Sequence, residues 1–399
     1  MECVILAAGE GTRMRPLTAR RPKVMIPIAN RPILEHLLIA ARDAGITDFV
    51  LVVGYGEKEI RNHFGDGSAI GTSIRYVTQR HQRGTADALA VVSGMVDGTF
   101  LLLNGDMVLE SADIRAICGL TPPVLAIYPS DHPMDFGVVA VVGEQVTGLE
   151  EKSSHPKSDL INAGAYLLTS EVFDLVARIS PSPRGEYELT DALGAWIREN
   201  RLAAYRLASW LDIGYPWDLL DANASLLAGM TEGREGAVEE GVSIHGNVSI
   251  GTGSRVLSGT YIEGPCAIGK DCRIGPHAYI RGATSIGDRC HIGHASEIKN
   301  SIVMAGTKIP HFNYIGDSVV GSGCNFGAGT KVANLRHDRA PVRVCGKDSR
   351  KVKFGAIIGD DVSFGINCSV NAGTVVGSSS RISPHSYLDG CIHDGTTIL

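Results

Sequence analysis

Residues 6–23 read LAAGEGTRMRPLTARRPK and combine a glycine-rich turn with closely spaced cations. The run follows a short apolar stretch that predicts a β-strand. Gly9 and Gly11 would let the backbone approach a ligand closely, and N–H groups in such a turn can bind phosphate oxygens. Arg13 and Lys23 add fixed positive charge. The segment therefore predicts a site for a phosphate-bearing ligand.

The whole string, with Pro16 and Pro22 in place, resembles the signature of the sugar-1-phosphate nucleotidyltransferases. In that reaction a phosphate oxygen attacks the α-phosphorus of a nucleotide and pyrophosphate leaves. Positioning and cationic stabilisation do most of the work. The resemblance assigns catalysis to Arg13 and Lys23, and nucleotide binding to Ala8, Gly9, Gly11 and Thr12.

A divalent cation, Mg²⁺, is expected with this chemistry, held by few carboxylates and by the substrate phosphates. Asp106 stands at a predicted strand end, and Asp212 lies in a WLDIG motif that resembles the family's second metal carboxylate. An aspartate at a strand end is also a common turn former, and that alternative stays open for both residues.

Gln79 indicates the choice of base. It lies five residues before Gly84 and Thr85, which the resemblance also places at the nucleotide. A glutamine amide offers a donor and an acceptor, matching O4 and N3–H of uracil or thymine. The residue therefore favours UTP or dTTP, with a surface glutamine as the alternative.

Three further positions match the family's sugar site. Gly137 would let the backbone approach the ring, Glu151 can accept hydrogen bonds from sugar hydroxyls, and Asn162 can donate and accept. Each is ordinary alone, and their order and spacing carry the prediction.

Residues 1–228 alternate apolar runs with amphipathic stretches, which predicts an α/β domain with a mainly parallel, doubly wound, Rossmann-like sheet. Ligands in such folds bind at the carboxyl ends of the strands. The predicted strands are Cys3–Ala7, Phe49–Val53, Ser73–Thr78, Thr99–Leu103 and Val124–Tyr128, and the clearest helices are Ile33–Ala44 and Thr85–Ser93.

From about residue 240 apolar residues recur every six positions. The series runs from Ile244 to Ile298 and returns from Ile358 to Leu388. A six-residue period is the mark of a parallel β-helix, and it resembles the left-handed hexapeptide helix, whose family habitually forms trimers. We expect a linker at 229–241, a left-handed β-helix acetyltransferase domain at 242–399, and a homotrimer.

The repeat lapses around 300–313 and again around 335–353. Interruptions of a solenoid are usually surface loops, and loops often carry function. Both lapses are therefore predicted to be loops, and His311 is expected to lie in the first of them.

Residues in and around the lapses resemble the acetyltransferase half of the bifunctional family that acetylates glucosamine-1-phosphate and then uridylylates it. An amine must lose a proton before it attacks a thioester, and a histidine suits the role of general base. The resemblance assigns that role to His311, with Glu297 able to orient its imidazole, and acetyl-CoA as co-substrate. It assigns substrate binding to Arg281, Glu297, Lys299, Tyr314, Asn325 and Asn334, and CoA binding to Ala328.

The chain also departs from that family. Leu335 stands where a tyrosine is expected, Ile366 replaces a small polar residue near the CoA site, and the loop 335–353 is longer and basic. That loop could meet CoA phosphates or be a solvated surface. Glucosamine versus galactosamine stays open, and residues 23–32 resemble glucose-1-phosphate thymidylyltransferases, so the first domain could be broad in sugar and base.

Composition narrows the function classes. A net charge of −6 argues against non-specific nucleic-acid binding, and no apolar run is long enough to span a bilayer. The nine cysteines include no CxxC pair, so reduced, buried thiols are expected rather than a disulfide framework. With no signal peptide apparent, a cytoplasmic location is predicted.

Two other interpretations compete with the bifunctional enzyme. In one, the chain is a glucose-1-phosphate thymidylyl- or uridylyltransferase whose β-helix serves only structure, regulation or oligomerisation. In the other, it is a catalytically inactive sensor of sugar nucleotides. The set around His311 argues against the first, and Arg13, Lys23 and Asp106 argue against the second.

Overall fold

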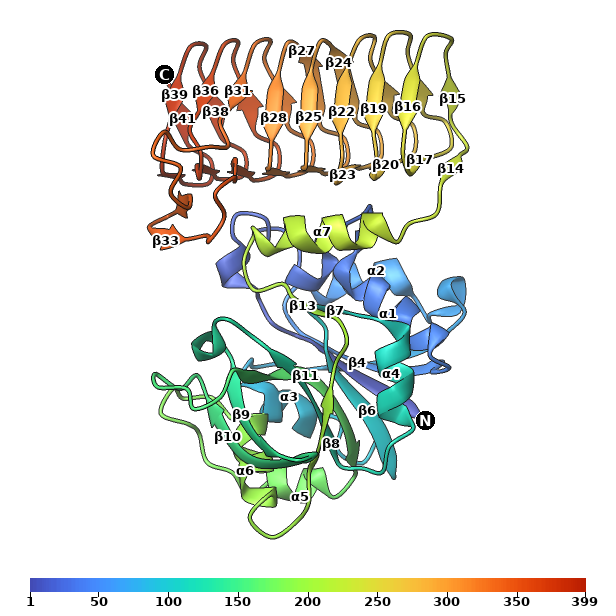
Figure 1. Cartoon of the computed structure of the whole chain (residues 1–399), viewed down its shortest axis with the longest axis vertical. Coiled ribbons are helices and arrows are strands. Elements are labelled where there is room, and N and C mark those ends of the chain that lie inside the picture. The colour runs from blue at the N-terminus through green and yellow to red at the C-terminus, as the bar shows by residue number, and fades with distance from the viewer. The chain divides into compact units, whose positions relative to one another are not determined.

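A computed structural model describes all residues from 1 to 399 (Figure 1). The chain divides into two compact units, which are described separately. Unit 1 consists of Met1–Glu10, Pro22–Met25 and Ile33–Asp212. Unit 2 consists of Gly11–Arg21, Ile26–Pro32 and Ile213–Leu399. Two short N-terminal segments, one of them the glycine-rich signature from Gly11 onward, thus belong to the unit that holds the C-terminal half.

Unit 1 is built on a nine-stranded sheet in the order β5-β4-β1-β6-β11-β8-β12-β10-β9. Strands β5, β4, β1 and β6 are parallel neighbours, and β11 runs antiparallel to β6. The five strands predicted from the sequence are all present. The strands of the sheet are β1 (Glu2–Ala7), β4 (Asp48–Val53), β5 (Ser73–Thr78), β6 (Thr99–Asn104), β8 (Val124–Pro129), β9 (Gly137–Val142), β10 (Gln145–Glu151), β11 (Leu160–Thr169) and β12 (Ala203–Arg206).

Helices cover both faces of this sheet (Figure 1). Successive residues of β1 face opposite sides, since Ile5 packs in a core with one set of helices and Val4 in a core with the other. The first set is α1 (Ile33–Asp43), α2 (Glu57–Phe64) and α4 (Ser111–Cys118), and the second is α3 (Thr85–Ala90), α5 (Val172–Val176) and α6 (Leu189–Trp196). Unit 1 is therefore a Rossmann-like α/β sandwich, as the alternating sequence predicted. Its sheet is mixed rather than mainly parallel, because β11 is antiparallel to both β6 and β8, and β10 is antiparallel to both β12 and β9.

Short elements complete the N-terminal half. Strand β7 (Met107–Leu109) pairs with β13 (Trp210–Asp212) in a separate two-stranded sheet. The remaining elements are η1 (Thr12–Met14), η2 (Lys23–Met25), β2 (Pro27–Ile28), β3 (Arg31–Pro32), η3 (Ser68–Ile70) and η4 (Pro133–Asp135). None of the helices in the chain combines the length and the apolar character that crossing a membrane would take.

Most of unit 2, from residue 233 to residue 398, is a parallel β-helix. Its strands form three parallel sheets, and through most of its length each strand pairs with the third strand along the chain. The first sheet holds β14 (Gly233–Arg234), β17 (Val248–Ile250), β20 (Cys266–Ile268), β23 (Thr284–Ile286), β26 (Ile302–Val303), β29 (Val319–Val320), β34 (Ile357–Ile358), β37 (Val375–Val376) and β40 (Cys391–Ile392). The second holds β15 (Ala237–Val238), β18 (Arg255–Val256), β21 (Arg273–Ile274), β24 (His291–His294), β27 (Lys308–His311), β30 (Asn325–Phe326), β35 (Ser363–Phe364), β38 (Arg381–Ile382) and β41 (Thr397–Ile398). The third holds β16 (Ser243–His245), β19 (Tyr261–Glu263), β22 (Tyr279–Arg281), β25 (Glu297–Lys299), β28 (Tyr314–Gly316), β31 (Lys331–Val332), β36 (Ser369–Val370) and β39 (Tyr387–Leu388).

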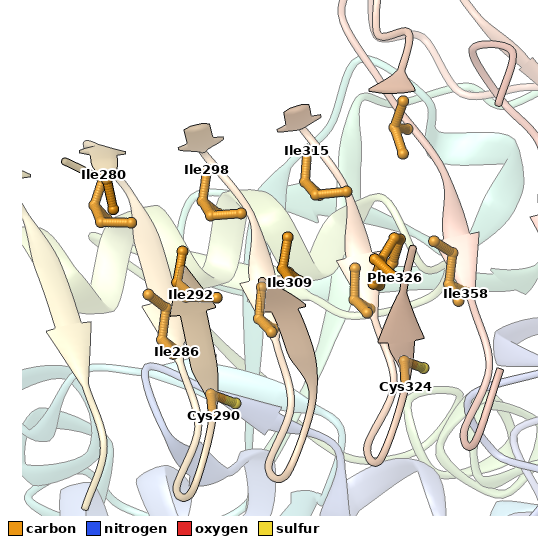
Figure 2. Packing of buried hydrophobic residues seen from close by; sticks show 14 of the residues in the cluster. Ile280, Ile286, Cys290, Ile292, Ile298, Ile309, Ile315, Cys324, Phe326 and Ile358 are labelled. Carbon is orange, nitrogen blue, oxygen red and sulfur yellow. The ribbon is translucent and has the colours of Figure 1, made fainter. Parts of the chain in front are cut away.

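The six-residue repeat supplies the core of the β-helix. Figure 2 shows the apolar residues stacked inside the coils, each lying against the equivalent residue of the next coil. Ile268, for example, pairs with Ile286, and both are at most 2% exposed. Because each coil places its apolar residues in line with those of its neighbours, the period read from the sequence becomes one continuous core.

The first lapse of the repeat is not a loop, contrary to the prediction. Ile286 pairs with Val303 and Ile298 pairs with Ile315, so these coils are seventeen residues long instead of eighteen. The turn after Ile298 is one residue shorter, the repeat shifts by one position, and the strands continue without interruption. The predicted loop residue His311 is the last residue of β27.

The second lapse does leave the β-helix. It carries the hairpin of β32 (Arg343–Val344) and β33 (Lys347–Asp348), after which Val320 pairs with Ile358. We call residues 335–353 the hairpin insert. Cys345 in this insert forms a disulfide with Cys391, which corrects the expectation of reduced thiols. The other seven cysteines are free, and six of them are buried, as predicted.

Helix α7 (Asp218–Ala228) lies along the β-helix (Figure 1). Its buried Asn223 donates to the carbonyl oxygen of Ala283 at 2.7 Å and accepts from the backbone N–H of Ala29 at 2.8 Å. Asn30 in turn donates to the carbonyl oxygen of Ile286 at 2.9 Å. Side-chain amides thus attach the segment Ile26–Pro32 to the coils within unit 2.

Candidate active sites

Several predicted nucleotide residues lie at one edge of the unit 1 sheet. Parallel strands end at the same edge. Ala8 and Gly9 follow β1, Gln79 follows β5, and Asp106 comes two residues after β6. The carboxyl edge of the sheet therefore carries these four predicted residues, whereas Gly11 and Thr12 belong to unit 2.

Lys23 and Asp106 form an ion pair at this edge. The Nζ atom of Lys23 lies 2.6 Å from Oδ2 of Asp106, and Lys23 is only 7% exposed. Asp212 in β13 pairs with Met107, the residue next to Asp106. The sheet register thus brings the backbones of the two predicted metal-binding aspartates close together.

This pair of carboxylates fits Mg²⁺, which is usually held by one or two carboxylates and by substrate phosphates. The structure contains no cluster of three or more acidic, histidine or cysteine side chains that could hold a metal alone. A cation at Asp106 and Asp212 would therefore take its other ligands from the nucleotide and from water.

Arg13 lies in η1 of unit 2, directly after the turn. Gly11 caps η1 with φ of 67°, a left-handed conformation that glycine adopts without steric cost. The guanidinium carbon of Arg13 lies 5.0 Å from the ring centroid of Tyr215. The arginine is exposed, and this aromatic contact was not predicted from the sequence.

Gln79 is buried rather than on the surface. Its amide nitrogen donates to Oδ2 of Asp87 at 2.7 Å, which leaves the amide oxygen as the acceptor that N3–H of uracil or thymine requires. Gly84 and Thr85 have a structural role here. Gly84 packs against the backbone of Tyr187, and the hydroxyl oxygen of Thr85 accepts from the N–H of Leu189 at 3.0 Å.

The three predicted sugar residues meet in unit 1. Gly137 in β9 pairs with Glu151 in β10. A Cβ placed on Gly137 would lie 3.0 Å from Oε2 of Glu151 and 3.4 Å from Cβ of Asn162. The amide of Asn162 donates to the hydroxyl of Tyr166 at 2.7 Å and is thereby held in place. A side chain at 137 would therefore be in tight contact with the carboxylate of Glu151, and glycine avoids this contact.

The Glu151 carboxyl group has an unusual environment. Burial raises its pKa, and the nearby carboxylate of Glu188 raises it further, while Arg184 opposes the shift. Glu151 Oε2 accepts from the hydroxyl of Thr190 at 3.3 Å. Glu151 is thus a partly buried hydrogen-bond acceptor that gains its proton at a higher pH than an ordinary glutamate does.

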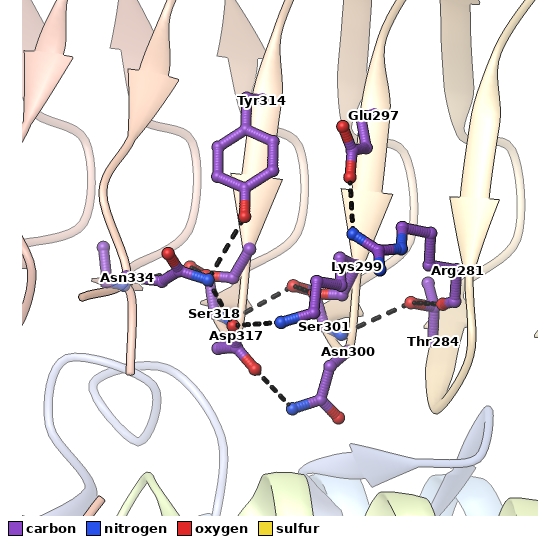
Figure 3. Close-up of polar contacts among 12 residues, drawn as sticks. Arg281, Thr284, Glu297, Lys299, Asn300, Ser301, Tyr314, Asp317, Ser318 and Asn334 are labelled. Carbon is purple, nitrogen blue, oxygen red and sulfur yellow. Dashed lines mark hydrogen bonds and ion pairs between the residues drawn. The ribbon is translucent and has the colours of Figure 1, made fainter. Parts of the chain in front are cut away.

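Five of the predicted acetyltransferase residues gather on the third sheet of the β-helix (Figure 3). Arg281 donates to Oε1 of Glu297 at 3.1 Å. Asn334 donates to the hydroxyl of Tyr314 at 3.2 Å. Tyr279, Glu297 and Tyr314 pair in register on neighbouring strands, and so do Arg281 and Lys299. The parallel register therefore builds this polar cluster from residues that are far apart in the chain.

Asp317 is the residue of this cluster that the sequence analysis missed. Its carboxylate is 3.1 Å from Nζ of Lys299, and it accepts from the amides of Asn300, at 2.7 Å, and of Asn334. The residue is 3% exposed and turns the chain with φ of 50°. Its position directly after Gly316, in a turn, was the available signal. From the sequence alone this position indicates a turn residue, whereas in the structure its carboxylate binds three polar side chains.

Both cations expected to bind the sugar phosphate are therefore already paired with carboxylates. Arg281 has five N–H donors and Lys299 has three, so each keeps donors beyond those that Glu297 and Asp317 occupy. Burial raises the pKa of Tyr314, and the neighbouring Glu297 and Asp317 raise it further, so its hydroxyl stays protonated.

His311 lies in a different sheet from this cluster. It is exposed, pairs with His294, and its carbonyl oxygen accepts from the N–H of Gly329 at 3.0 Å. Ala328 is the neighbour of that glycine, and Asn325 lies on β30, next to β27. The structure thus groups His311 with the predicted CoA residue, while the carboxylate of Glu297 contacts Arg281 and does not orient the imidazole.

Several cationic side chains of the hairpin insert contact partners within the chain. Lys351 forms an ion pair with Asp221, and Arg336 pairs with Asp338 at 2.6 Å. Lys347 lies 4.9 Å from the ring centroid of Tyr215. These contacts favour a structural use of this basic stretch.

Comparisons with known proteins cover the whole chain. The family of nucleotidyl transferases matches residues 2–229, and the GMPPB C-terminal domain matches residues 262–376. A bifunctional protein GlmU of Methanococcus maripaludis is 45% identical over 100% of this chain and 97% of its own. The GlmU protein of Methanocaldococcus jannaschii is 41% identical over the same shares. A bifunctional sugar-1-phosphate nucleotidylyltransferase/acetyltransferase of Sulfurisphaera tokodaii is 37% identical over 98% of this chain and 97% of its own.

Solved structures resemble the nucleotidyltransferase part. A Bacillus anthracis protein assigned as a glucose-1-phosphate thymidylyltransferase superposes with a TM-score of 0.54 at 28% identity, over 59% of this chain and 98% of that one. A UDP-glucose pyrophosphorylase, at 22% identity and a TM-score of 0.53, covers 57% of this chain and 99% of its own, and shows the fold alone. With relatives of this identity spanning nearly its full length, the chain belongs to the GlmU family of bifunctional enzymes, which combine sugar-1-phosphate nucleotidyl transfer with acetyl transfer.

Proposed function

We propose that the chain carries out two consecutive reactions of UDP-N-acetyl amino sugar synthesis. The first transfers the acetyl group of acetyl-CoA to the amine of glucosamine-1-phosphate, or of its galactosamine counterpart. The second transfers a uridylyl group from UTP to the resulting sugar 1-phosphate and releases pyrophosphate. The observation that carries both steps is the presence of a polar cluster in each half, one around Glu151 and one around Asp317, in a chain whose relatives are bifunctional.

In uridylyl transfer, Arg13 and Lys23 would stabilise charge on the α-phosphate and on departing pyrophosphate. The nucleotide would lie along Ala8, Gly9, Gly11 and Thr12, with Gln79 at its base. Mg²⁺ held by Asp106 and Asp212 would neutralise phosphate charge. UTP is the expected nucleotide, and dTTP remains a second candidate.

The sugar would lie against Gly137, with Glu151 accepting from its hydroxyls and Asn162 donating to it. Support comes from the way these residues meet in unit 1. Glycine at 137 leaves the neighbouring carboxylate of Glu151 uncrowded, so that this carboxylate can accept hydrogen bonds from the sugar.

In acetyl transfer, the substrate amine attacks the thioester carbonyl, the C–S bond breaks, and CoA leaves as a thiol. His311 would accept the proton that the amine loses and pass it to the departing sulfur. In support, its imidazole is exposed, and its carbonyl oxygen accepts from the N–H of Gly329, the neighbour of Ala328. Arg281 and Lys299 would bind the sugar phosphate, with Tyr314, Asn325 and Asn334 as further contacts.

The finer architecture belongs to the same proposal. We assign nucleotidyl transfer to residues 1–228, a connection to 229–241 and acetyl transfer to 242–399, although β14 and β15 in the connection already pair with strands of the β-helix. A left-handed coil, a homotrimer and a cytoplasmic location stay predictions. The alternative of a purely structural β-helix is less supported, since the nearly full-length relatives above have names that describe bifunctional proteins.

An activity matrix of the purified protein tests this function. Four sugar 1-phosphates are combined with UTP or dTTP, with and without acetyl-CoA, and both pyrophosphate and free CoA thiol are measured. We expect CoA release with an amino sugar 1-phosphate and pyrophosphate release with its acetylated product. Pyrophosphate release with no CoA release from any substrate would leave only the structural alternative.

A further inference from the structure

The segment that carries Arg13 is attached to the β-helix in unit 2. Gly11–Arg21 belongs to the same compact unit as the coils, although the sequence places it at the start of the nucleotidyltransferase domain. Two sets of contacts make this attachment, one at each end of the segment. Their residues come from the β-helix, from the hairpin insert and from the stretch just before α7.

The first attachment is a buried ion pair at the end of the segment. The Arg21 guanidinium lies 2.7 Å from Oδ2 of Asp360, and the two side chains are only 13% and 5% exposed. The other carboxylate oxygen of Asp360 accepts from the N–H of Ser322 at 2.8 Å, which fixes its orientation. A buried pair of this kind is costly to break, because the remaining charge is left without a partner.

An exposed ion pair lies directly beside the buried one. Arg20 contacts Asp361, and it also donates to the hydroxyl of Ser379 at 2.7 Å. The side chains of Arg20 and Asp361 are 48% and 55% exposed, so water screens their attraction. The neighbouring positions 360 and 361 therefore offer a matched comparison between a buried contact and an exposed one.

The second attachment is the aromatic contact of Arg13. The guanidinium carbon of Arg13 lies 5.0 Å from the ring centroid of Tyr215, and Nζ of Lys347 in the hairpin insert lies 4.9 Å from it. The ring also stacks on Trp217, at 4.7 Å between centroids and 7° between planes. Trp217 contacts Phe354, which directly follows the insert, edge to face at 6.4 Å between ring centroids. Tyr215 is thus held by its neighbours and offers Arg13 a fixed surface.

The insert that supports Tyr215 is itself fixed. The disulfide from Cys345 to Cys391 ties its hairpin to the last coils, and Lys351 forms an ion pair with Asp221 of α7. A guanidinium that lies on a fixed ring loses less freedom when it binds a phosphate than one that moves freely in water.

We propose that the β-helix positions Arg13 for nucleotidyl transfer, with Tyr215 and Asp360 as positioning residues. The inference rests on the proposed role of Arg13 at the nucleotide. Tyr215 holds the guanidinium, and Asp360 holds the loop that carries it. The C-terminal half therefore contributes to the first half's reaction as well as carrying its own.

A double-mutant cycle tests the role of Tyr215. Pyrophosphate release from UTP is measured with N-acetylglucosamine-1-phosphate in Tyr215→Leu, Tyr215→Phe, Arg13→Ala and the Arg13→Ala/Tyr215→Leu double variant. Loss of a cation–π contact predicts a kcat about 2- to 30-fold lower in Tyr215→Leu with a smaller change in KM, and near-normal activity in Tyr215→Phe, which keeps the ring. In the Arg13→Ala background, Tyr215→Leu should cost nothing further.

The outcomes separate this inference from the function on which it rests. An additive cycle, or a normal kcat in Tyr215→Leu, would overturn the positioning role alone. Normal activity in Arg13→Ala would instead remove Arg13 from the proposed nucleotide site, and the inference with it.

Asp360→Asn tests the second attachment, with Asp361→Asn as the matched control. Asp360→Asn should lower kcat for uridylyl transfer about 10-fold, within the range that a misplaced group can cost, while acetyl transfer stays within about 2-fold. Retained acetyl transfer shows that the β-helix is folded. Asp361→Asn should leave both activities unchanged. Equal loss of both activities in Asp360→Asn, or an unchanged uridylyl transfer, would overturn the positioning role of Asp360.

Discussion

Replacing Lys23 by methionine is expected to abolish most uridylyl transfer while leaving the fold intact. Lys23 is 7% exposed and its ammonium lies 2.6 Å from the carboxylate of Asp106. Methionine keeps most of the length of the side chain and removes its charge and its N–H donors. Loss of one charge-stabilising group should lower kcat about 10²-fold or more, equivalent to ~2.7 kcal/mol of transition-state stabilisation.

The stability change should be small, and its size follows from the exposure of the partner. The Asp106 side chain is 35% exposed, so water can solvate its carboxylate once the ammonium is gone. The free energy of unfolding should therefore change by about 1 kcal/mol or less. In Asp106→Asn a buried ammonium would be left without its carboxylate, so a larger loss, on the order of 2 kcal/mol, is expected there.

The assay is pyrophosphate release from UTP and N-acetylglucosamine-1-phosphate, with CoA release from acetyl-CoA and glucosamine-1-phosphate measured on the same protein. Lys58→Met, on the exposed side of α2, is the matched control and should leave both activities unchanged. A Lys23→Met protein that keeps more than half of the wild-type kcat for pyrophosphate release would refute the assignment of Lys23.

Three further predictions concern the sugar, the acetyl transfer site and the disulfide. Asp317→Asn should lower acetyl transfer about 10-fold or more, because each lost hydrogen bond to a charged group is worth ~1.5–3 kcal/mol, and it should leave uridylyl transfer within about 2-fold. Asp338→Asn, at an exposed position, should change neither activity. Burial and Glu188 raise the pKa of Glu151, so its ionised, hydroxyl-accepting form is lost as the pH falls through that raised pKa. As the pH is lowered, the KM for sugar 1-phosphate should therefore begin to rise at a higher pH than it would with a glutamate of ordinary pKa. If Glu151→Gln shows the same dependence of KM on pH as the wild type, this prediction is contradicted. Cys345→Ser should destabilise the C-terminal coils by at most about 4 kcal/mol, the loop-closure value for a sequence separation of 46. Thiol titration of the denatured, unreduced wild-type protein should find seven thiols, and a count of nine would disprove the bond.

The repeat could be read from the sequence because its signal is local. An apolar residue every sixth position predicts the coils directly, and Ile250, Ile262 and Ile274 are all at most 1% exposed. The first lapse was misread for the same reason. The turn after Ile298 is one residue shorter, and only the pairing of Ile298 with Ile315 shows that the coil continues.

The candidate sites could be predicted in part. Gly137, Glu151 and Asn162 meet as their motifs indicated, because those motifs record a family's site. Asp317 was missed because an aspartate after a glycine reads as a turn residue, and its three partners come from other coils. The contact of Arg13 with Tyr215 joins positions about two hundred residues apart, and no periodicity or composition records such a contact.

The measurement that tests the central claim most directly is made on His311→Ala. With glucosamine-1-phosphate and acetyl-CoA, CoA release should fall about 10²- to 10⁴-fold, the usual range for loss of a general base, and raising the pH should restore part of it by deprotonating the amine in solution. Pyrophosphate release from UTP and ready-made N-acetylglucosamine-1-phosphate should stay near wild type. A folded His311→Ala protein that releases CoA at the normal rate would contradict the account of the second site, and one that loses both activities together would contradict the claim of two separate reactions.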